Sequence, residues 1–189
     1  MYKIDMKKIR EEKDILQSSS SGGVFYYLAK EILTHQGIVY GATISSLKVR
    51  HIRINEVTDI KKIQGSKYSQ SNLKDIFPKV KTDLEENKKV LFSGTPCQIL
   101  ALRTYLGKDY SKLYTVSIIC HGVINDDILE KRVREIEKNF DTEIEEVKYK
   151  SKVNGWDASS IEYKTKRINK AYKFADDPMM ALFVDNYIL

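Results

Sequence analysis

The chain has 189 residues, of which 42% are hydrophobic and 31% are charged. This balance is that of a globular protein, and it excludes collagen, a coiled coil and wholesale disorder. Lysine and arginine outnumber aspartate and glutamate by 32 to 26, which gives a formal net charge of +6. The lysines are spread along the chain among acids, whereas a nucleic-acid interface concentrates its cations, so we interpret the charge as an ordinary solvated surface.

The sequence contains no apolar run of the length that crosses a bilayer. The N-terminus, MYKIDMKKIREEKD, is charged and lacks the apolar stretch of a secretory signal. Two cysteines do not make a disulfide framework. We therefore predict a cytoplasmic protein in a reducing compartment.

The N-terminal half alternates helical and extended patterns. In chain order we expect a charged arm or helix at 1–17, a helix at 24–35, strands at 38–44 and 49–54, a short helix at 56–63, a polar loop at 65–71 and a helix at 72–87. Gly37 is expected to cap the helix at 24–35, and Pro78 to perturb the helix at 72–87.

The C-terminal half begins with a clearer order. We expect a buried strand at 90–92, a helix at 96–106 ended by Gly107, a buried strand at 113–119, a helix at 126–139, paired strands at 144–149 and 159–163, and a last helix from about 177. The strand–helix–strand–helix order predicts a parallel pair of strands. The predicted fold class is therefore α/β, a mixed or largely parallel sheet flanked by helices, with a small β-hairpin region near 144–165.

A serine–glycine turn, Ser18–Gly23, precedes the first predicted helix. Free amides at a helix N-terminus, beside glycines that allow close approach, suit a phosphate group. Ordinary capping by Ser20 or Ser21 explains the same residues equally well. The turn is neither a Walker loop nor the Gly-x-Gly-x-x-Gly dinucleotide pattern.

The loop Gly65-Ser66-Lys67-Tyr68-Ser69-Gln70-Ser71 holds a cation, an aromatic ring and several hydroxyls. Lys67 can pair with a phosphate and Tyr68 can stack on a flat ring. Composition alone favours a polar surface loop.

Both cysteines follow strands of the predicted parallel pair, and ligands of open α/β sheets bind beyond the carboxyl ends of such strands. Cys97 lies in the first turn of the helix at 96–106, where unpaired amides stabilise a thiolate, and Cys120 closes the next strand. Cys97 is consistent with a nucleophile, a redox thiol, a metal ligand or a small buried hydrophobe. Metal binding is weakly indicated by composition, because no Cys-x2-Cys or His-x3-His spacing occurs. His35 and His51 are interpreted as residues without a special role.

Six stretches taken in order carry a resemblance: SSSSGGVFYYLAKEIL, GIVYGA, IQGSKYSQSNL, VLFSGTPCQILALRTYL, LYTVSIICHGV and the NGW turn. They resemble the coenzyme F-420 hydrogenase/dehydrogenase beta-subunit family from about Ser18 to Leu189. The resemblance implies a flavin-binding-type α/β domain over 18–189 that holds FAD and a 4Fe–4S cluster. It implies an oxidoreductase that passes electrons or hydride between an iron–sulfur donor and a soluble carrier, either deazaflavin F-420 or another acceptor. Members in bacteria without deazaflavin are often associated with polysaccharide biosynthesis.

The resemblance also implies site residues. The FAD site would be lined by Ser20, Ser21, Gly22, Gly23, Ser66, Lys67, Tyr68 and Thr95, and the cluster ligands would include Cys97 and Cys120. The implied partners are a redox protein or ferredoxin-like domain and a small hydride carrier. An oligomeric state is left open, and no acid–base residue is identifiable.

The chain departs from the family pattern at three places. No cysteine occurs in the first 17 residues, Ile124-Asn125 stands where the family has Pro-Ser, and the chain stops before the Cys-x-x-Cys that follows in the family. We therefore expect an incomplete domain that lacks the remaining cluster ligands. The rival interpretations are a degenerate nucleotide or sugar-nucleotide binding protein without redox activity, and a thiol enzyme that uses Cys97.

Overall fold

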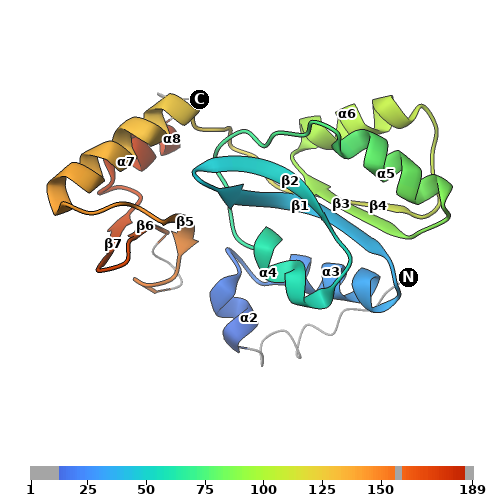
Figure 1. The fold of residues 1–189 in the computed structure, drawn as a ribbon, viewed down its shortest axis with the longest axis horizontal. Coiled ribbons are helices and arrows are strands. Elements are labelled where there is room, and N and C mark those ends of the chain that lie inside the picture. Colours follow the sequence, from blue (N-terminus) through green and yellow to red (C-terminus); the bar gives the residue numbers. More distant parts are fainter. Residues whose placement is uncertain (1–12, 156–158, 186–189) are drawn as a thin grey trace. The chain divides into compact units, whose positions relative to one another are not determined.

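The computed structural model describes residues 13–155 and 159–185 (Figure 1). Of the arm predicted at 1–17, residues 1–12 lie outside this description, and helix α2 (Lys13–Ser18) covers the rest. The chain divides into two compact units with interleaved segments. The first comprises 1–43, 50–64 and 71–121, and the second 44–49, 65–70 and 122–189.

The first unit is built on a four-stranded sheet with the order β2-β1-β3-β4. The strands are β1 (Ile38–Ser45), β2 (Lys48–Ile54), β3 (Val90–Gly94) and β4 (Leu113–Ser117). Strand β3 pairs in parallel with β1 and with β4, as the strand–helix–strand order predicts. The α/β class and the largely parallel sheet are therefore confirmed.

Helices cover both faces of this sheet. They are α3 (Val24–Thr34), the 3-10 turn η1 (Val57–Asp59), α4 (Ile60–Ile63), α5 (Ile76–Glu85) and α6 (Pro96–Leu106). Because successive strand residues point to opposite faces, Tyr40 and Phe92 pack with α5 and α6, while Val39 and Leu91 pack with α3 and α4.

The second unit packs two helices with an antiparallel sheet of order β5-β6-β7. Its elements are α7 (Asp126–Phe140), β5 (Glu146–Ser151), β6 (Ser160–Lys164), β7 (Asn169–Lys173) and α8 (Pro178–Val184). The hairpin expected near 144–165 is present, and β7 extends it by a strand that the sequence pattern did not reveal. Residues 156–158 of the predicted turn lie outside the described residues.

A buried carboxylate fixes the start of α8. Asp177 has no exposed surface, and it accepts hydrogen bonds from Arg132 Nε, Tyr163 Oη and the Met180 amide, each at 3.0 Å. The amide bond is an N-cap contact, so the helix begins where Asp177-Pro178 predicts it. The Arg132 guanidinium neutralises the buried charge, which would otherwise be costly.

Three local expectations need correction. Gly37 does close α3, since its amide donates to the Ile32 carbonyl at 2.9 Å, but the left-handed residue after the helix is Gln36 (φ 58). Gly37 also provides close approach, because a Cβ there would lie 2.6 Å from Ile32 Cγ2. Pro78 does not perturb its helix, because α5 begins at Ile76 and proline is tolerated in a first turn. Strand β4 is only half-buried, because it is an edge strand of the sheet, and it ends at Ser117 rather than Ile119.

No helix within the described ranges 13–155 and 159–185 has both the length and the apolar character needed to cross a membrane.

Candidate functional site

The carboxyl ends of β3 and β4 lie side by side. Gly94 pairs with Ser117, and the Ile118 amide donates to the Gly94 carbonyl at 3.0 Å. Cys97 and Cys120 each follow this pair by three residues, and both thiols are exposed. The parallel register therefore brings the two segments that carry the cysteines to one edge of the sheet, as predicted.

The first turn of α6 holds Cys97. The Thr95 amide donates to Gln98 Oε1 at 3.0 Å, and Thr95 Oγ1 lies 3.0 Å from Cys97 Sγ. A Cβ on Gly94 would lie 2.9 Å from Gln98 Oε1 and from Cε1 of the buried Phe92 ring, so a side chain here would displace one of them. Pro96 occupies the first helical position, so the thiol lies among the unpaired amides of the helix start.

A buried histidine contacts the C-terminal end of β3. His51 of β2 places Nδ1 2.7 Å from Ser71 Oγ and Nε2 2.9 Å from the Ser93 carbonyl oxygen. Because a carbonyl only accepts, Nε2 carries the proton and Nδ1 accepts from the serine hydroxyl in the neutral ring. The ring also stacks on Phe92 at 5.1 Å. His51, for which we predicted no special role, therefore anchors the strand residue that precedes Gly94.

The serine–glycine turn leads directly into α3. The N-cap residue is Gly23 (φ 76), which has no side chain. Neither Ser20 nor Ser21 is therefore the N-cap residue of α3. A Cβ on Gly22 would meet no atom within 4 Å, so the backbone at this position faces open space. Ser20 is half-buried and Ser21 is exposed. The arrangement retains the features that suit a phosphate group.

Gln64, which sequence reasoning missed, connects two of the predicted motifs. Its Nε2 donates to Ser19 Oγ at 3.3 Å and to Ser18 Oγ at 3.4 Å. It also directly precedes Gly65, the first residue of the polar loop. The residue immediately before the polar loop is therefore hydrogen-bonded to the serine–glycine turn. The sequence pattern carries no signal for this contact, because it joins residues 45 and 46 positions apart.

The polar loop itself belongs to the second unit, where it is anchored on both sides. Ser66 bridges to Tyr149, and Ser69 bridges to Ile124. Lys67 Nζ donates to the Gly65 carbonyl at 3.2 Å, and burial lowers the pKa of Lys67 to about 8. At neutral pH this side chain still carries its charge.

Tyr68 has a packing role in the second unit. Its ring lies 5.1 Å from the rings of Tyr149 and Phe183 and 6.1 Å from that of Phe174. Burial raises the pKa of Tyr68 to about 12. The stacking of Tyr68 on a flavin, which the resemblance implies, stays a prediction.

The described residues do not by themselves form an iron–sulfur site. Among them, no group of three or more His, Cys, Asp or Glu side chains could hold a metal ion. A 4Fe–4S cluster is held by four thiolates, whereas Cys97 and Cys120 are the two cysteines of the sequence. A cluster on this chain would need ligands from elsewhere.

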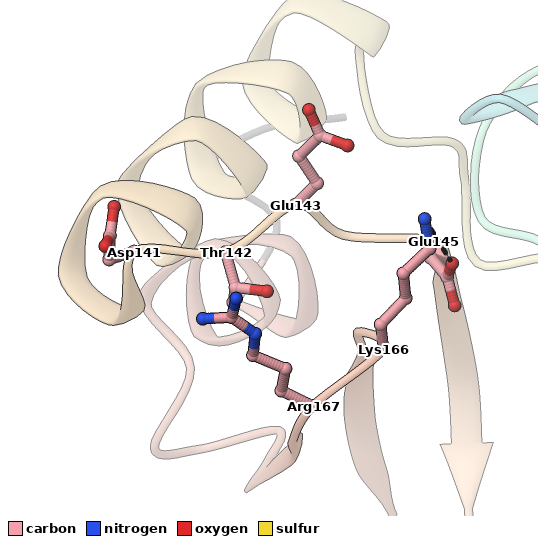
Figure 2. A pocket seen from close by; sticks show the side chains of 6 residues that line it. All are labelled: Asp141, Thr142, Glu143, Glu145, Lys166 and Arg167. Carbon is pink, nitrogen blue, oxygen red and sulfur yellow. Dashed lines mark ion pairs between the residues drawn. The ribbon is translucent and has the colours of Figure 1, made fainter.

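Two surface hollows are lined by none of the predicted site residues. One, of about 280 Å³, lies in the second unit between Asp141, Thr142, Glu143, Glu145, Lys166 and Arg167 (Figure 2). Its charges are mixed, and Lys166 Nζ lies 3.9 Å from Glu145 Oε1, so it has no preference for one sign of ligand. The other, of about 400 Å³, lies in the first unit along β2 and the start of α5.

Comparisons with known proteins agree with the sequence resemblance. The family that represents the C-terminal part of the beta subunit of coenzyme F420 hydrogenase/dehydrogenase matches residues 87–182, just over half of the chain. The chain belongs to this family, as the motifs predicted.

A solved structure of similar fold is a chain of the F420-reducing [NiFe] hydrogenase complex from Methanosarcina barkeri, determined as a xenon derivative. The TM-score is 0.57 and the identity 17%, and the likeness covers 86% of this chain. This chain spans 57% of the length of that one. No curated protein matches.

Proposed function

We propose that the chain is part of a flavin and iron–sulfur oxidoreductase that passes electrons or hydride between an iron–sulfur donor and a soluble carrier. The carrier is deazaflavin F-420 or, in organisms that lack it, another acceptor. Polysaccharide biosynthesis is one pathway in which we propose that such an oxidoreductase acts. The observation that carries the proposal is the pair of exposed cysteines, Cys97 and Cys120, each three residues beyond paired strand ends in a chain of this family.

The residues proposed to hold FAD are those of the serine–glycine turn, with the polar loop. Gly22 leaves open space beside the N-terminus of α3, where amides attract phosphate oxygens. Lys67 supplies a cation at neutral pH, and Thr95 a hydroxyl beside Cys97. FAD, when bound, supplies hydride transfer at its ring N5. The chain's own contribution is to anchor the phosphates and orient the ring.

Cys97 and Cys120 are proposed as two of the four ligands of a 4Fe–4S cluster. The remaining ligands would come from a redox partner protein or a ferredoxin-like region. Neither thiol is in a disulfide and both are exposed, a state that a reducing compartment such as the cytoplasm maintains.

The test is anaerobic purification of the chain with its full reading frame, followed by an absorption spectrum and release of bound flavin by heat. We expect released FAD together with a broad iron–sulfur absorbance. Cys97→Ala and Cys120→Ala should each abolish that absorbance and leave the FAD. A colourless, folded protein that takes up neither flavin nor iron on reconstitution would refute the proposal.

A matched pair of variants separates the flavin site from a general effect of charge. Gly22→Asp places a carboxylate at the N-terminus of α3, and Thr34→Asp places the same charge at the other end of that helix. Repulsion of the flavin phosphates should weaken FAD binding about tenfold or more in Gly22→Asp alone. Equal binding by the two variants would place the phosphates elsewhere.

The thiol-enzyme interpretation remains a second candidate because Cys97 Sγ is exposed and lies 3.0 Å from Thr95 Oγ1 at a helix start. It predicts stoichiometric alkylation of Cys97 near neutral pH, with Cys120 reacting much more slowly. Equal alkylation rates of the two thiols would exclude it.

A further inference from the structure

The hollow of about 400 Å³ in the first unit is lined by cations from three separate elements. Arg50 and Arg53 come from β2, Lys74 from the segment just before α5, and Lys79 from the first turn of α5. We call it the basic hollow. No carboxylate is among its lining residues in the part of the chain that the structure describes.

Backbone contacts hold the wall of the basic hollow in place. The His51 amide donates to the Asn72 carbonyl at 3.0 Å, and Arg50 bridges to Asn72. Asn72 Oδ1 in turn accepts from the Lys74 amide at 2.8 Å. The segments that carry Arg50 and Lys74 are therefore fixed relative to each other before any ligand binds, which lowers the entropic cost of binding.

Arg53 is also held in one orientation. Asp83 accepts from its Nε at 2.8 Å and from its Nη2 at 3.0 Å. This pair uses two of the five N–H groups of a guanidinium. Asp83 cancels one positive charge, so the lining arginines and lysines leave an excess of about three positive charges around the hollow.

The lining also has an apolar part. Ile76 is buried and Ile52 is half-buried, and both line the hollow with the cations. The volume lies in the range of small-molecule sites, about 300–1,000 Å³. A ligand that matches these features carries clustered anionic oxygens and a flat or apolar body.

We propose that the basic hollow binds a small phosphate-bearing anion of the nucleoside diphosphate type. The proposal stands apart from the flavin site, since none of the residues assigned to FAD lines this hollow. Arg50, Lys74 and Lys79 are exposed and can reach phosphate oxygens, while the half-buried Ile52 offers an apolar surface to the base.

The test is calorimetric titration of the full 189-residue chain with ADP and, separately, with inorganic pyrophosphate. We expect both to bind, ADP more tightly. Lys74→Ala and Lys79→Ala should each weaken binding about tenfold or more, because each removes one charge-assisted hydrogen bond. Lys81→Ala is the matched control: Lys81 lies on the same helix, is two residues from Lys79, does not line the hollow and pairs with Glu85.

Other outcomes would overturn the proposal. They are a folded chain that binds neither probe, or an equal loss in Lys81→Ala, which would indicate diffuse charge. A loss in Lys67→Met with none in Lys74→Ala would place ADP at the polar loop. Binding of a polyglutamate peptide but not of ADP would indicate an acidic protein partner. FAD uptake by Lys74→Ala, Lys79→Ala and Lys81→Ala should stay unchanged, so failure here is distinguishable from failure of the proposed function.

Discussion

Replacing Asp83 with asparagine removes a charge that joins three elements of the first unit. Asp83, on α5, accepts from Tyr40 Oη of β1 at 2.6 Å and from Arg53 Nε of β2 at 2.8 Å. It also accepts from Lys88 Nζ at 3.0 Å. The Asp83 side chain is 6% exposed, whereas those of Arg53 and Lys88 are about a third exposed. The cations can therefore turn to water when the carboxylate is removed.

The size of the effect follows from the pKa of Asp83. Burial alone would raise this pKa, but hydrogen bonds from Arg53, Tyr40 and Lys88 outweigh it and lower the pKa from 3.8 to about 2. At about 1.4 kcal/mol per pKa unit, the folded state gains about 2 kcal/mol from the ionised carboxyl. Because the pKa is depressed on folding, this stability is present above about pH 4 and is lost as the pH falls toward 2.

Urea unfolding followed by circular dichroism measures the effect. Asp83→Asn should lower the free energy of unfolding by about 2 kcal/mol at pH 7, and the difference from wild type should shrink as the pH approaches about 2.5. Glu85→Gln on the same helix is the control, since its ion pair with Lys81 is exposed and worth about 0.5 kcal/mol or less. A loss at pH 7 no larger than in the control, or one that persists undiminished in acid, would refute the reasoning.

Three further predictions concern other parts of the chain. Asp177→Ala should destabilise the chain by about 3–5 kcal/mol in the same urea assay, because it removes the buried carboxylate shared by Arg132, Tyr163 and the Met180 amide and leaves Arg132 with the exposed Glu135. Gly37→Ala should lower the free energy of unfolding by about 1–3 kcal/mol, because the added Cβ clashes with Ile32. Gly22→Ala, at a position that faces open space, should lower it by less than about 1 kcal/mol. Equal losses in the two variants would contradict the close-approach argument. Lys67 should react with an amine reagent with a midpoint near pH 8, as its lowered pKa requires, and a midpoint near 10.5 would show that the side chain is solvated.

The sequence predicted correctly the bounds of elements that begin and end at capping residues such as proline and glycine. Pro96 at the first position and Gly107 (φ 67) after the last residue mark α6 at the bounds expected from the sequence. Strand β7 was missed because Asn169-Lys-Ala-Tyr-Lys is polar and half-exposed and therefore lacks the apolar pattern that marks a buried strand. The start of α5 was predicted too early. Asp75, the residue before the helix, adopts a left-handed conformation (φ 62) that the apolar pattern does not reveal.

The candidate site could likewise be predicted only in part. Cys97 and Cys120 could be placed at one sheet edge because parallel register follows from the order of elements along the chain. The roles of His51 and Gln64 could not, because their partners lie 20 to 46 residues away and only the folded chain brings them together. A single sequence shows that such residues are polar and says nothing about which distant hydroxyl or carbonyl they meet.

The interleaving of the two units bears on how the chain can be divided. The segment that matches the family, 87–182, begins just before β3 and leaves out β1 and β2. In isolation it would present the edge of β3 that Ile38–Tyr40 pairs with, and it would uncover the Leu91 face that α3 and α4 bury. An unpaired, apolar strand edge recruits other chains. We therefore expect that the segment 87–182 does not fold on its own. Expression from residue 87 should yield aggregates, whereas expression from a start upstream of α3 should keep the sheet intact.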